Sequence, residues 1–530
     1  MHRRDFLKRA ALAGGAITLG GATVLGCDDD DDRSGTTGAA RSLTAVQPSD
    51  SPIDTIVVVT MENRSFDHYL GWLGGDAAYR EHGRKRYGRG FHVDARTDLA
   101  FQDASGAWVA TQHLTTSPVE PDPYRGCGHP VPGHSWKKAR RELDAGFIAE
   151  GTGNDSYALG YYRAGDLPVT AHLARRFTVC DRSFPSILGP TFPNRQYLHA
   201  ATSEGWTTDP GPLKPGTYTA DTIWKKLIAA GVPCGYYYSD CPVLLMYGEG
   251  YKPIIHTVDD FFDDCEQGTL PNVVYVEPKF GGPFRTDDHS DGDVRLGQRF
   301  ILDVFRAFAQ SKYWERGAFV LTYDEWGGFF DHVRPPILQD GERIQVYTPD
   351  TFQQTGFRIP TVVASPYAPR GGVDHTTYDH TSILRFIEWR FLGAPEAGPG
   401  GDHATWYLTR RDRHANNLGG LLVDADPDVD LDFDTDVEIP PATAACTVGP
   451  PRPADPELAE PDPFTLHPLM QELLDTGYPP AAYAPHHQPG AIAPAAPPET
   501  PTTTTDPGGG PPVTSPPPSP PTPGSGTTVG

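Results

Sequence analysis

The sequence predicts an α/β fold in which a mostly parallel sheet is sandwiched between layers of helices. Short runs rich in β-branched residues alternate with amphipathic stretches along the chain, a pattern typical of strands joined by helical crossovers. The chain has 530 residues, which is long enough for one large folded body with tails at both ends.

Four runs are expected to be strands of this sheet, at residues 55–60, 272–276, 318–323 and 361–364. Apolar residues recur at helical spacing between residues 296 and 308, and residues 382–391 have the same character, so both stretches are predicted to be helices. Residues 75–165 are rich in Gly, Tyr and charged residues without a clear period. We expect long loops there, lying over the active face.

The domain boundaries follow from composition. Residues 51–440 are predicted to form the folded catalytic domain. Residues 441–490 are Pro-rich but carry some apolar side chains, among them Phe464 and Leu469, and are predicted to wrap over the domain with one short helix. Residues 491–530 are dominated by Pro, Thr, Gly and Ser, so we expect an extended, disordered tail.

Residues 1–27 have the layout of an export signal. Arg3-Arg4-Asp5-Phe6-Leu7-Lys8 precedes an apolar, Ala/Gly-rich stretch and resembles a twin-arginine signal. Val24-Leu25-Gly26-Cys27 resembles a lipobox, in which Cys27 is lipidated; ordinary signal cleavage nearby is the alternative. Residues 28–50 are predicted to be a flexible tether. The protein is therefore expected either lipid-anchored in the cell envelope or secreted, with the anchor or the substrate bringing it to a membrane.

The charge balance argues against nucleic acid as a partner. The formal net charge is -24, and removal of residues 1–26, which hold four basic and one acidic residue, leaves about -27. Polyanion binding needs a basic face, which this balance does not supply. An acidic protein that acts on an anionic group has to concentrate positive charge locally, and a bound metal ion does so most economically.

Apart from Cys27, the chain has six cysteines, at positions 127, 180, 234, 241, 265 and 446. In an exported protein they allow up to three disulfides. Cys234 and Cys241 flank a Tyr-rich run at a hairpin-like separation, so this pair is favoured. A zinc site is the alternative, although the sequence has no Cys-x-x-Cys pair.

Two predicted strands end in oxygen-bearing side chains. Glu62 and Asn63 follow the strand at 55–60, and Asp324 and Glu325 follow the strand at 318–323. Because ligands bind beyond the carboxyl ends of parallel strands, these four residues could converge as an oxygen-rich site for a divalent cation. A solvated loop with acidic helix caps is the alternative for each acid taken alone.

In a third segment, a hydroxyl-bearing residue stands at the start of a predicted helix. Pro193 suits the first turn of a helix, which places Thr191 at or just before the helix amino terminus. Free N–H groups and the helix dipole favour a bound phosphate there. The alternative is that Thr191 simply caps the helix.

Five short motifs that contain these residues occur in order over about residues 54–391. They are Glu62-Asn63-Arg64-Ser65-Phe66-Asp67-His68; Gly189-Pro190-Thr191-Phe192-Pro193-Asn194-Arg195; Asp288-His289 with Asp293 and Gly297-Gln298; Thr322-Tyr323-Asp324-Glu325 with Gly327-Gly328-Phe329 and Asp331-His332-Val333; and Tyr378-Asp379-His380 with Ser382. In these motifs the chain resembles the phosphoesterase family of bacterial phospholipases C, plant non-specific phospholipases C and related acid phosphatases.

The resemblance implies an alkaline-phosphatase-like core, a hydroxyl nucleophile and a divalent metal ion. By motif position, Glu62, Asn63, Asp324 and Glu325 match metal ligands, and Thr191 matches the nucleophile. His289 matches a histidine that contacts phosphate, and His134 is similar to a second one. His332 is expected nearby. Two features depart from the pattern: Trp326 stands where many members have His, and acid phosphatases of the family can carry Ser in place of Thr191. The ligand set admits calcium, magnesium, manganese or zinc.

The expected function is an exported, metal-dependent phosphoesterase that works through a phosphothreonine intermediate, most simply a phospholipase C that releases diacylglycerol and a phosphorylated head group. A broad acid phosphatase acting on small monoesters is the alternative, and a non-catalytic surface lipoprotein is a third. A phospholipase needs apolar groups around its site. Trp136, Phe329, Phe330 and the run Tyr236–Tyr238 are candidates, with core packing as the other explanation.

Overall fold

The computed structural model describes residues 41–115, 122–282, 284–338, 352–395, 406–431, 437–441 and 464–483. The expected signal, lipobox, carboxyl-terminal tail and Cys446 lie outside these residues. Everything below concerns the compact unit that begins at Arg41. No described helix is both long and apolar enough to cross a lipid bilayer.

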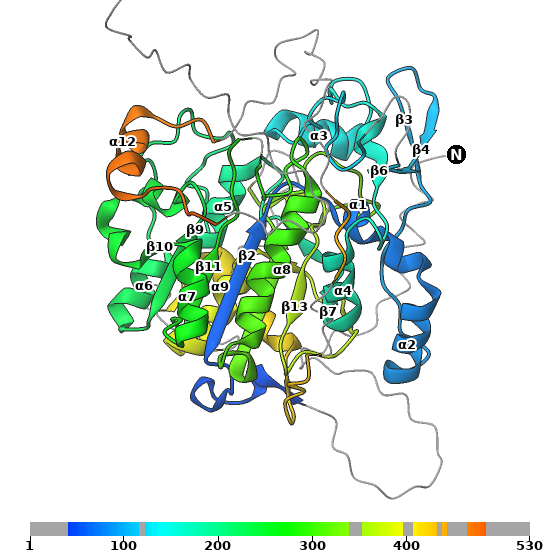
Figure 1. Cartoon of the computed structure of the whole chain (residues 1–530). Helices are drawn as coiled ribbons and strands as arrows, with labels where there is room; N and C mark the ends of the chain where they lie inside the picture. The colour runs from blue at the N-terminus through cyan, green and yellow to red at the C-terminus, as the bar shows by residue number, and fades with distance from the viewer. Residues whose placement is uncertain are drawn as a thin grey trace, which may run out of the picture. The chain divides into compact units, whose positions relative to one another are not determined.

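An eight-stranded sheet forms the centre, in the order β10-β9-β11-β2-β12-β13-β7-β14 (Figure 1). In that order the strands are Ile255–Thr257, Cys234–Tyr238, Val273–Val276, Thr55–Met61, Gly317–Tyr323, Val362–Ala364, Thr178–Cys180 and Val373–Asp374. Every neighbouring pair is parallel except the two made by β13. The mostly parallel sheet is thus confirmed, and its four predicted strands are β2, β11, β12 and β13.

The α-helices are α1 (Phe66–Leu70), α2 (Ala77–Tyr87), α3 (Trp136–Ala145), α4 (Pro168–Arg176), α5 (Thr191–Ala200), α6 (Ile223–Ala230), α7 (Val258–Gln267), α8 (Val294–Gln310), α9 (His380–Leu392), α11 (Arg410–His414) and α12 (Pro468–Gly477). Short two-stranded sheets pair β1 (Arg41–Ser42) with β16 (Val423–Asp424), β3 (Ala100–Gln102) with β4 (Trp108–Ala110), β5 (Gln112–His113) with β6 (Gly160–Tyr161), and β8 (Ser183–Phe184) with β15 (Tyr378–Asp379).

Helices cover both faces of the sheet because the central strands are apolar on both sides. All seven residues of β2 are buried, as expected for a strand inside a parallel sheet. Its alternate side chains enter two separate cores: Val57 and Val59 pack with α4, α7 and α8, whereas Ile56 and Val58 pack with α5, α6 and α9. The sandwich of helices predicted from the sequence is therefore confirmed.

The predicted helices at 296–308 and 382–391 lie within α8 and α9. The region 75–165 is less irregular than expected, since it contains α2, α3 and the short strands β3 to β6. α2 shows little apolar periodicity because it buries only Tyr79 and Gly83, whereas α3 is amphipathic and packs on a small separate core.

The folded body begins before residue 51 and includes part of the carboxyl-terminal segment. Arg41–Ser42 pairs with β16, and Leu43 is buried, so the end of the expected tether is part of the body. Near the carboxyl end, Phe464 stacks on Phe280 with ring centroids 4.0 Å apart, and the predicted short helix is α12.

The preferred disulfide is wrong. Cys180, Cys234, Cys241 and Cys265 are free, buried thiols, and Cys127 is disulfide-bonded. Cys234 opens β9, and Cys241 lies three residues beyond the strand's other end. A five-residue strand alone spans about 13 Å, whereas disulfide-bonded Cα atoms lie within about 7 Å of each other. The Tyr236–Tyr238 run between them is buried in the core and does not rim a site.

Candidate active site

The carboxyl ends of β2 and β12 bring the two acidic segments together. The strands are parallel neighbours, with Met61 opposite Tyr323. Immediately beyond them, the Asn63 N–H donates a 3.0 Å hydrogen bond to Asp324 Oδ1. Asn63 has a φ of 57°, and a Cβ on Gly327 would lie 2.0 Å from the Asn63 carbonyl oxygen, so only glycine fits there. The predicted convergence of these segments is confirmed.

Each of the three converging acids has a buried oxygen that accepts no hydrogen bond. These are Glu62 Oε2, Asp324 Oδ2 and Glu325 Oε1. Burial, followed by the neighbouring charge of Asp324, raises the pKa values of Glu62 and Glu325 well above the ordinary value. Burial also raises the pKa of Asp324 to about 6. Crowded, buried oxygens of this kind fit a divalent cation, which would satisfy them and stabilise their charged forms.

Arg195 supplies part of the missing positive charge. Its guanidinium lies 2.8 Å from Glu62 Oε1, 3.3 Å from Asp324 Oδ2 and 2.6 Å from Glu277 Oε2. All four side chains are buried. Arg195 contributes one positive charge, whereas the three carboxylates can carry three negative charges. The cluster therefore keeps a net negative charge that a further cation could neutralise.

Thr191 is the first residue of α5, and its hydroxyl faces the acidic cluster. Its Oγ donates to Asn63 Oδ1 over 3.4 Å. The N-cap of α5 is Pro190, and no side chain in that position caps the helix, so the capping alternative for Thr191 is wrong. The next N–H, that of Phe192, donates to Asp209 Oδ1 over 2.8 Å.

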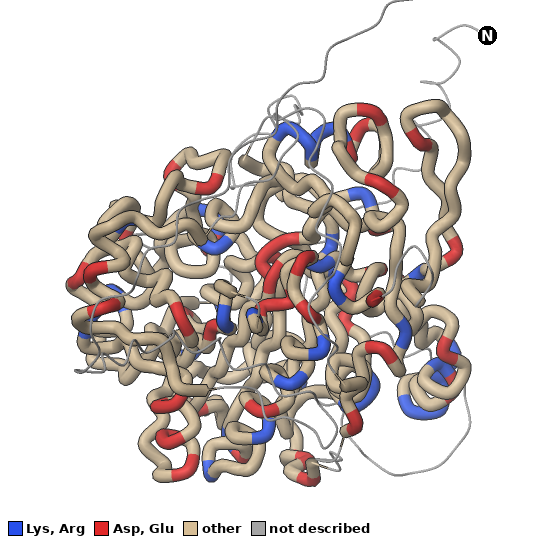
Figure 2. Tube along the Cα trace, turned by 45° about the horizontal axis from the view of Figure 1, so that its top comes forward, with Lys and Arg blue, Asp and Glu red and all other residues tan. Residues whose placement is uncertain are grey.

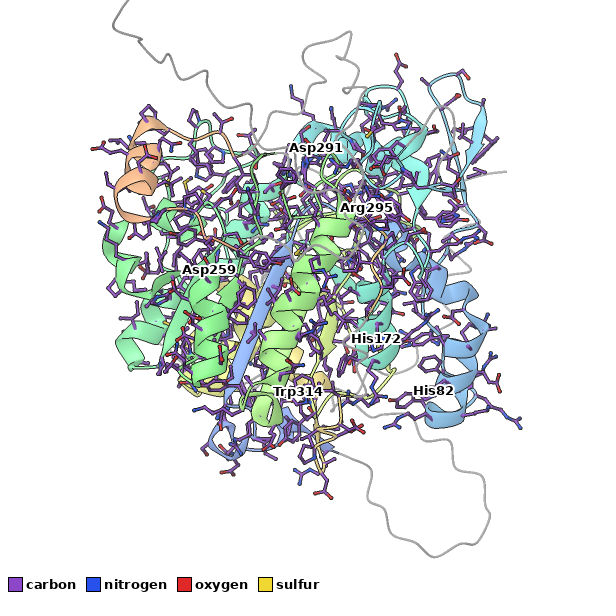
Figure 3. All side chains as sticks on the ribbon, in the orientation of Figure 1. His82, His172, Asp259, Asp291, Arg295 and Trp314 are labelled. Carbon is purple, nitrogen blue, oxygen red and sulfur yellow. The ribbon has the colours of Figure 1, made fainter. Side chains whose placement is uncertain are left out.

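His134 and His289 both lie at this site. Their ring centroids are 6.2 Å apart at a steep angle, and His134 Nε2 lies 3.8 Å from Glu325 Oε1. His134 Nδ1 is 2.9 Å from the Pro132 carbonyl oxygen, which can only accept, so Nδ1 carries the proton. His289 Nδ1 lies 2.5 Å from Asp291 Oδ1. Asp291 is labelled in Figure 3, beyond the carboxyl end of β2.

The carboxylate of Asp291 interacts favourably with the imidazole ring of His289 and with the Arg285 guanidinium. Burial alone would raise the pKa of Asp291, but the neighbouring His289 and Arg285 lower it far below its usual range. Arg64, a residue of the first motif to which the sequence analysis gave no role, contacts the backbone of Asp288 and His289. Its guanidinium donates to the carbonyl oxygens of Asp288 (2.6 Å) and His289 (3.2 Å).

Asp67, Asp331 and His332 form a second acidic cluster. Ligand atoms of Asp67, Asp331 and His332 lie within 4.8 Å of one another, a spacing that could hold a metal ion. Here, however, Arg358 donates to both carboxylates, and His332 Nδ1 contacts Asp67 Oδ2 at 2.5 Å. Every carboxylate oxygen of Asp67 and Asp331 accepts at least one hydrogen bond. His332, expected near the first site, belongs to this cluster.

The aromatic candidates divide into core and rim. Phe329 and Phe330 are buried. Trp326 is buried too, and its indole N–H donates to Glu142 Oε2 over 2.9 Å, so its side chain packs inside the protein. Trp136 is partly exposed and packs close to Gly189, two residues before Thr191. Among the aromatic candidates named from the sequence, Trp136 is the one that keeps some exposed surface.

Residues 53–392 match the family model described as the Phosphoesterase family. The chain belongs to this family. It is similar to non-specific phospholipase C5 of Arabidopsis thaliana, with 31% identity over 71% of this chain and 75% of that protein. It is also similar to phospholipase C B of Mycobacterium tuberculosis, with 31% identity over 65% of this chain and 74% of that protein. The resemblance seen in the motifs is confirmed, and this phosphoesterase is a hydrolase of phosphoric ester bonds.

Among solved structures, one neighbour is a protein of the alkaline phosphatase superfamily from Vibrio parahaemolyticus. It aligns over 57% of this chain and 74% of that one, with 9% identity and a TM-score of 0.29.

Several residues of the site received no role in the sequence analysis, although Arg195 stands in one of its motifs. Arg195 carried a signal, because it lies four residues after Thr191 and therefore on the same helix face. Glu277 follows the predicted strand β11 directly, so it too sits at the carboxyl edge of the sheet. Asp209 lies in the long connection between α5 and α6, and nothing in the local sequence marks it.

Proposed function

We propose that this protein is a metal-dependent phosphoesterase that uses Thr191 as its nucleophile and acts as a phospholipase C. One observation carries the proposal: the Thr191 hydroxyl lies at the amino terminus of α5, against Asn63, beside three buried acids that each have an oxygen without a hydrogen bond. This arrangement has a hydroxyl, helix N–H groups and a cation-binding donor set in one place.

Glu62, Asn63, Asp324 and Glu325 would hold the cation. When bound, a divalent cation supplies positive charge that favours ionisation of a nearby hydroxyl and offsets the charge of a phosphate. The Asp67–Asp331–His332 cluster is the less suitable place, since Arg358 already provides its positive charge.

The residues of the chain account for the two steps of hydrolysis. In the first, the Thr191 hydroxyl loses its proton, Oγ forms a bond to phosphorus, and the bond from phosphorus to the alcohol oxygen breaks, which leaves a phosphothreonine. His289 or His134 takes up the proton from Thr191 and passes one to the departing alcohol oxygen. In the second step, water attacks the phosphothreonine, and the phosphate leaves as Thr191 regains its hydroxyl.

The named relatives favour phospholipids as substrates, because the proteins similar over most of this chain are phospholipases C. Trp136, which is partly exposed and packs close to Gly189, suits an apolar leaving group. Hydrolysis of small phosphate monoesters remains the second candidate, since the same nucleophile and cation site would serve it. Export by the twin-arginine route, with Cys27 as lipid anchor, would place the enzyme at a membrane surface.

The test compares wild type with Thr191→Ser and Thr191→Ala on phosphatidylcholine and on 4-nitrophenyl phosphate, with and without chelator. Thr191→Ser keeps a hydroxyl and should retain turnover, whereas Thr191→Ala should lose roughly 10⁴-fold or more, the usual effect of removing a nucleophile. Turnover by Thr191→Ala at the wild-type rate would refute the role of Thr191. Full activity after exhaustive chelation would refute metal dependence.

A further inference from the structure

The turn that carries His289 has a strained backbone. Asp288, the residue before it, has a φ of 73°, in the left-handed region that non-glycine residues uncommonly adopt. Such a conformation persists only where the surrounding contacts hold it. Two contacts do so here. The Tyr323 hydroxyl donates to the Asp288 carboxylate over 2.7 Å, and the Arg64 guanidinium donates to the backbone carbonyl oxygens of Asp288 and His289.

The Arg64 guanidinium is itself fixed in the protein interior, where it is fully buried. Its Nη1 lies 2.9 Å from His68 Nε2, and His68 Nδ1 lies 2.7 Å from the Gly160 carbonyl oxygen, which can only accept. His68 therefore carries its proton on Nδ1 and accepts from Arg64. The guanidinium also lies over the ring of Phe329, 4.8 Å from its centroid, and this ring stacks on His68 at 3.8 Å. These contacts set the plane of the guanidinium.

Arg64 also belongs to the segment that supplies two of the proposed metal ligands. It follows Asn63, whose φ of 57° is left-handed as well. The backbone of Arg64 thus continues the Glu62–Asn63 segment, while its side chain holds the turn with His289. Figure 2, which turns the top of Figure 1 forward, shows acidic positions gathered near the middle of the view with basic positions beside them. One residue therefore connects the candidate cation site with a candidate catalytic histidine.

We propose that Arg64 is a positioning residue that acts through His289, by fixing the place of its imidazole relative to the Glu62–Asn63 segment. An imidazole has to lie within hydrogen-bond reach of the atom whose proton it moves, so a displacement of about 1 Å can cost roughly 100-fold in rate. A guanidinium donates to two successive carbonyls at once, whereas a Lys ammonium is a point charge on a flexible stem. The inference rests on the proposed function and adds the residue through which His289 is placed.

A double-mutant cycle tests this role, because two residues that act through each other give non-additive effects. The measurement is kcat/KM on 4-nitrophenyl phosphorylcholine, a soluble phosphodiester, for wild type, Arg64→Lys, His289→Asn and the double variant. In wild type, Arg64→Lys should lower kcat and kcat/KM together by roughly 10- to 100-fold, as expected for a contact that matters in the transition state. In the His289→Asn background the same change should cost less than about threefold.

Arg358→Lys is the matched control. It also replaces a fully buried arginine, but the guanidinium of Arg358 contacts Asp67 and Asp331 instead of the His289 turn. Its effect on kcat/KM should be the same in wild type and in His289→Asn. Any loss that Arg358→Lys causes through general destabilisation is thereby separated from a loss that acts through His289.

A second measurement does not require turnover. In NMR spectra, the ring C–H signals of His289 are assigned by their absence in His289→Asn. They should shift in Arg64→Lys and stay at the wild-type position in Arg358→Lys. Arg64→Gln, which removes the buried charge, provides a second variant in case Arg64→Lys does not fold, and thermal unfolding checks the folding of each variant.

Equal effects of Arg64→Lys in the two backgrounds overturn the inference, as does an unshifted His289 signal in a folded Arg64 variant. Non-additivity of the same size with Arg358→Lys also overturns it. Wild-type turnover by His289→Asn overturns it as well, because His289 would then have no catalytic part, while the role of Thr191 would be unaffected. If wild type hydrolyses neither this ester nor any phospholipid, the proposed function is refuted instead, and the NMR signals alone decide whether Arg64 places His289.

Discussion

Replacing Asp324 by Asn should stabilise the metal-free protein at neutral pH, and the gain should vanish in acid. Burial raises the pKa of Asp324 from 3.8 to about 6, and the opposing effects of Arg195 and of N–H donors are smaller. An acid whose pKa is raised on folding takes up protons as the chain folds. The contribution of Asp324 to the free energy of unfolding is fully present below the pKa of Asp324 in the unfolded chain. It is lost as the pH rises to about 6, its pKa in the folded protein.

The magnitude follows from the two pKa values. At about 1.4 kcal/mol per pKa unit, a rise from 3.8 to about 6 corresponds to about 3 kcal/mol of stability lost above pH 6. Asn does not ionise, so the variant avoids this loss. It also removes a negative neighbour that raises the pKa values of Glu62 and Glu325. The gain at pH 7.5 should therefore be about 3 kcal/mol, a large share of a typical stability of about 5–15 kcal/mol.

The assay is urea unfolding of wild type and Asp324→Asn in chelator, at several pH values between 4 and 7.5. The quantity of interest is the difference in unfolding free energy between the two proteins. Groups whose pKa does not depend on Asp324, such as Asp288 with a pKa of about 7, cancel in that difference. Saturating divalent cation should reverse its sign, because the ion binds the folded wild type more tightly.

Two results would refute this reasoning. The first is a difference in unfolding free energy that stays constant from pH 4 to 7.5. That result would mean that ionisation of Asp324 does not destabilise the folded protein. The second is a wild type that is more stable than Asp324→Asn at pH 7.5 in chelator, which would mean that its negative charge is already fully compensated by the protein.

Two further outcomes follow from the structure. Arg358→Met should lower the unfolding free energy by about 3–5 kcal/mol, the usual cost of leaving buried carboxylates without their partner, while the bound metal per chain stays unchanged. Urea unfolding and elemental analysis measure both, and a fall in metal content would assign the ion to the Asp67 cluster. Cys234 and Cys241 should react with a maleimide in urea without any reductant, because both are thiols; mass spectrometry that finds them protected would contradict the structure.

Much of the fold could be predicted because its signals are local. The β-branched runs that form β2, β11, β12 and β13 report burial on both faces, and parallel strands place their carboxyl ends along one edge. For this reason the meeting of Asn63 with Asp324 could be expected before the structure was known. The catalytic and metal-binding roles of these residues remain predictions.

The sequence by itself determined the mostly parallel sheet, the family and the segments that carry the site, because periodicity and strand-end motifs depend on neighbouring residues. Only the tertiary structure decided which distant side chains share a buried environment: Arg195 with Glu277, Arg358 with Asp67 and Asp331, and Asp209 with the helix end at Thr191. It also decided that Cys234 and Cys241 stay apart. These outcomes depend on distances across the fold and on burial, which set the strength of charge interactions and leave no periodic trace in the chain.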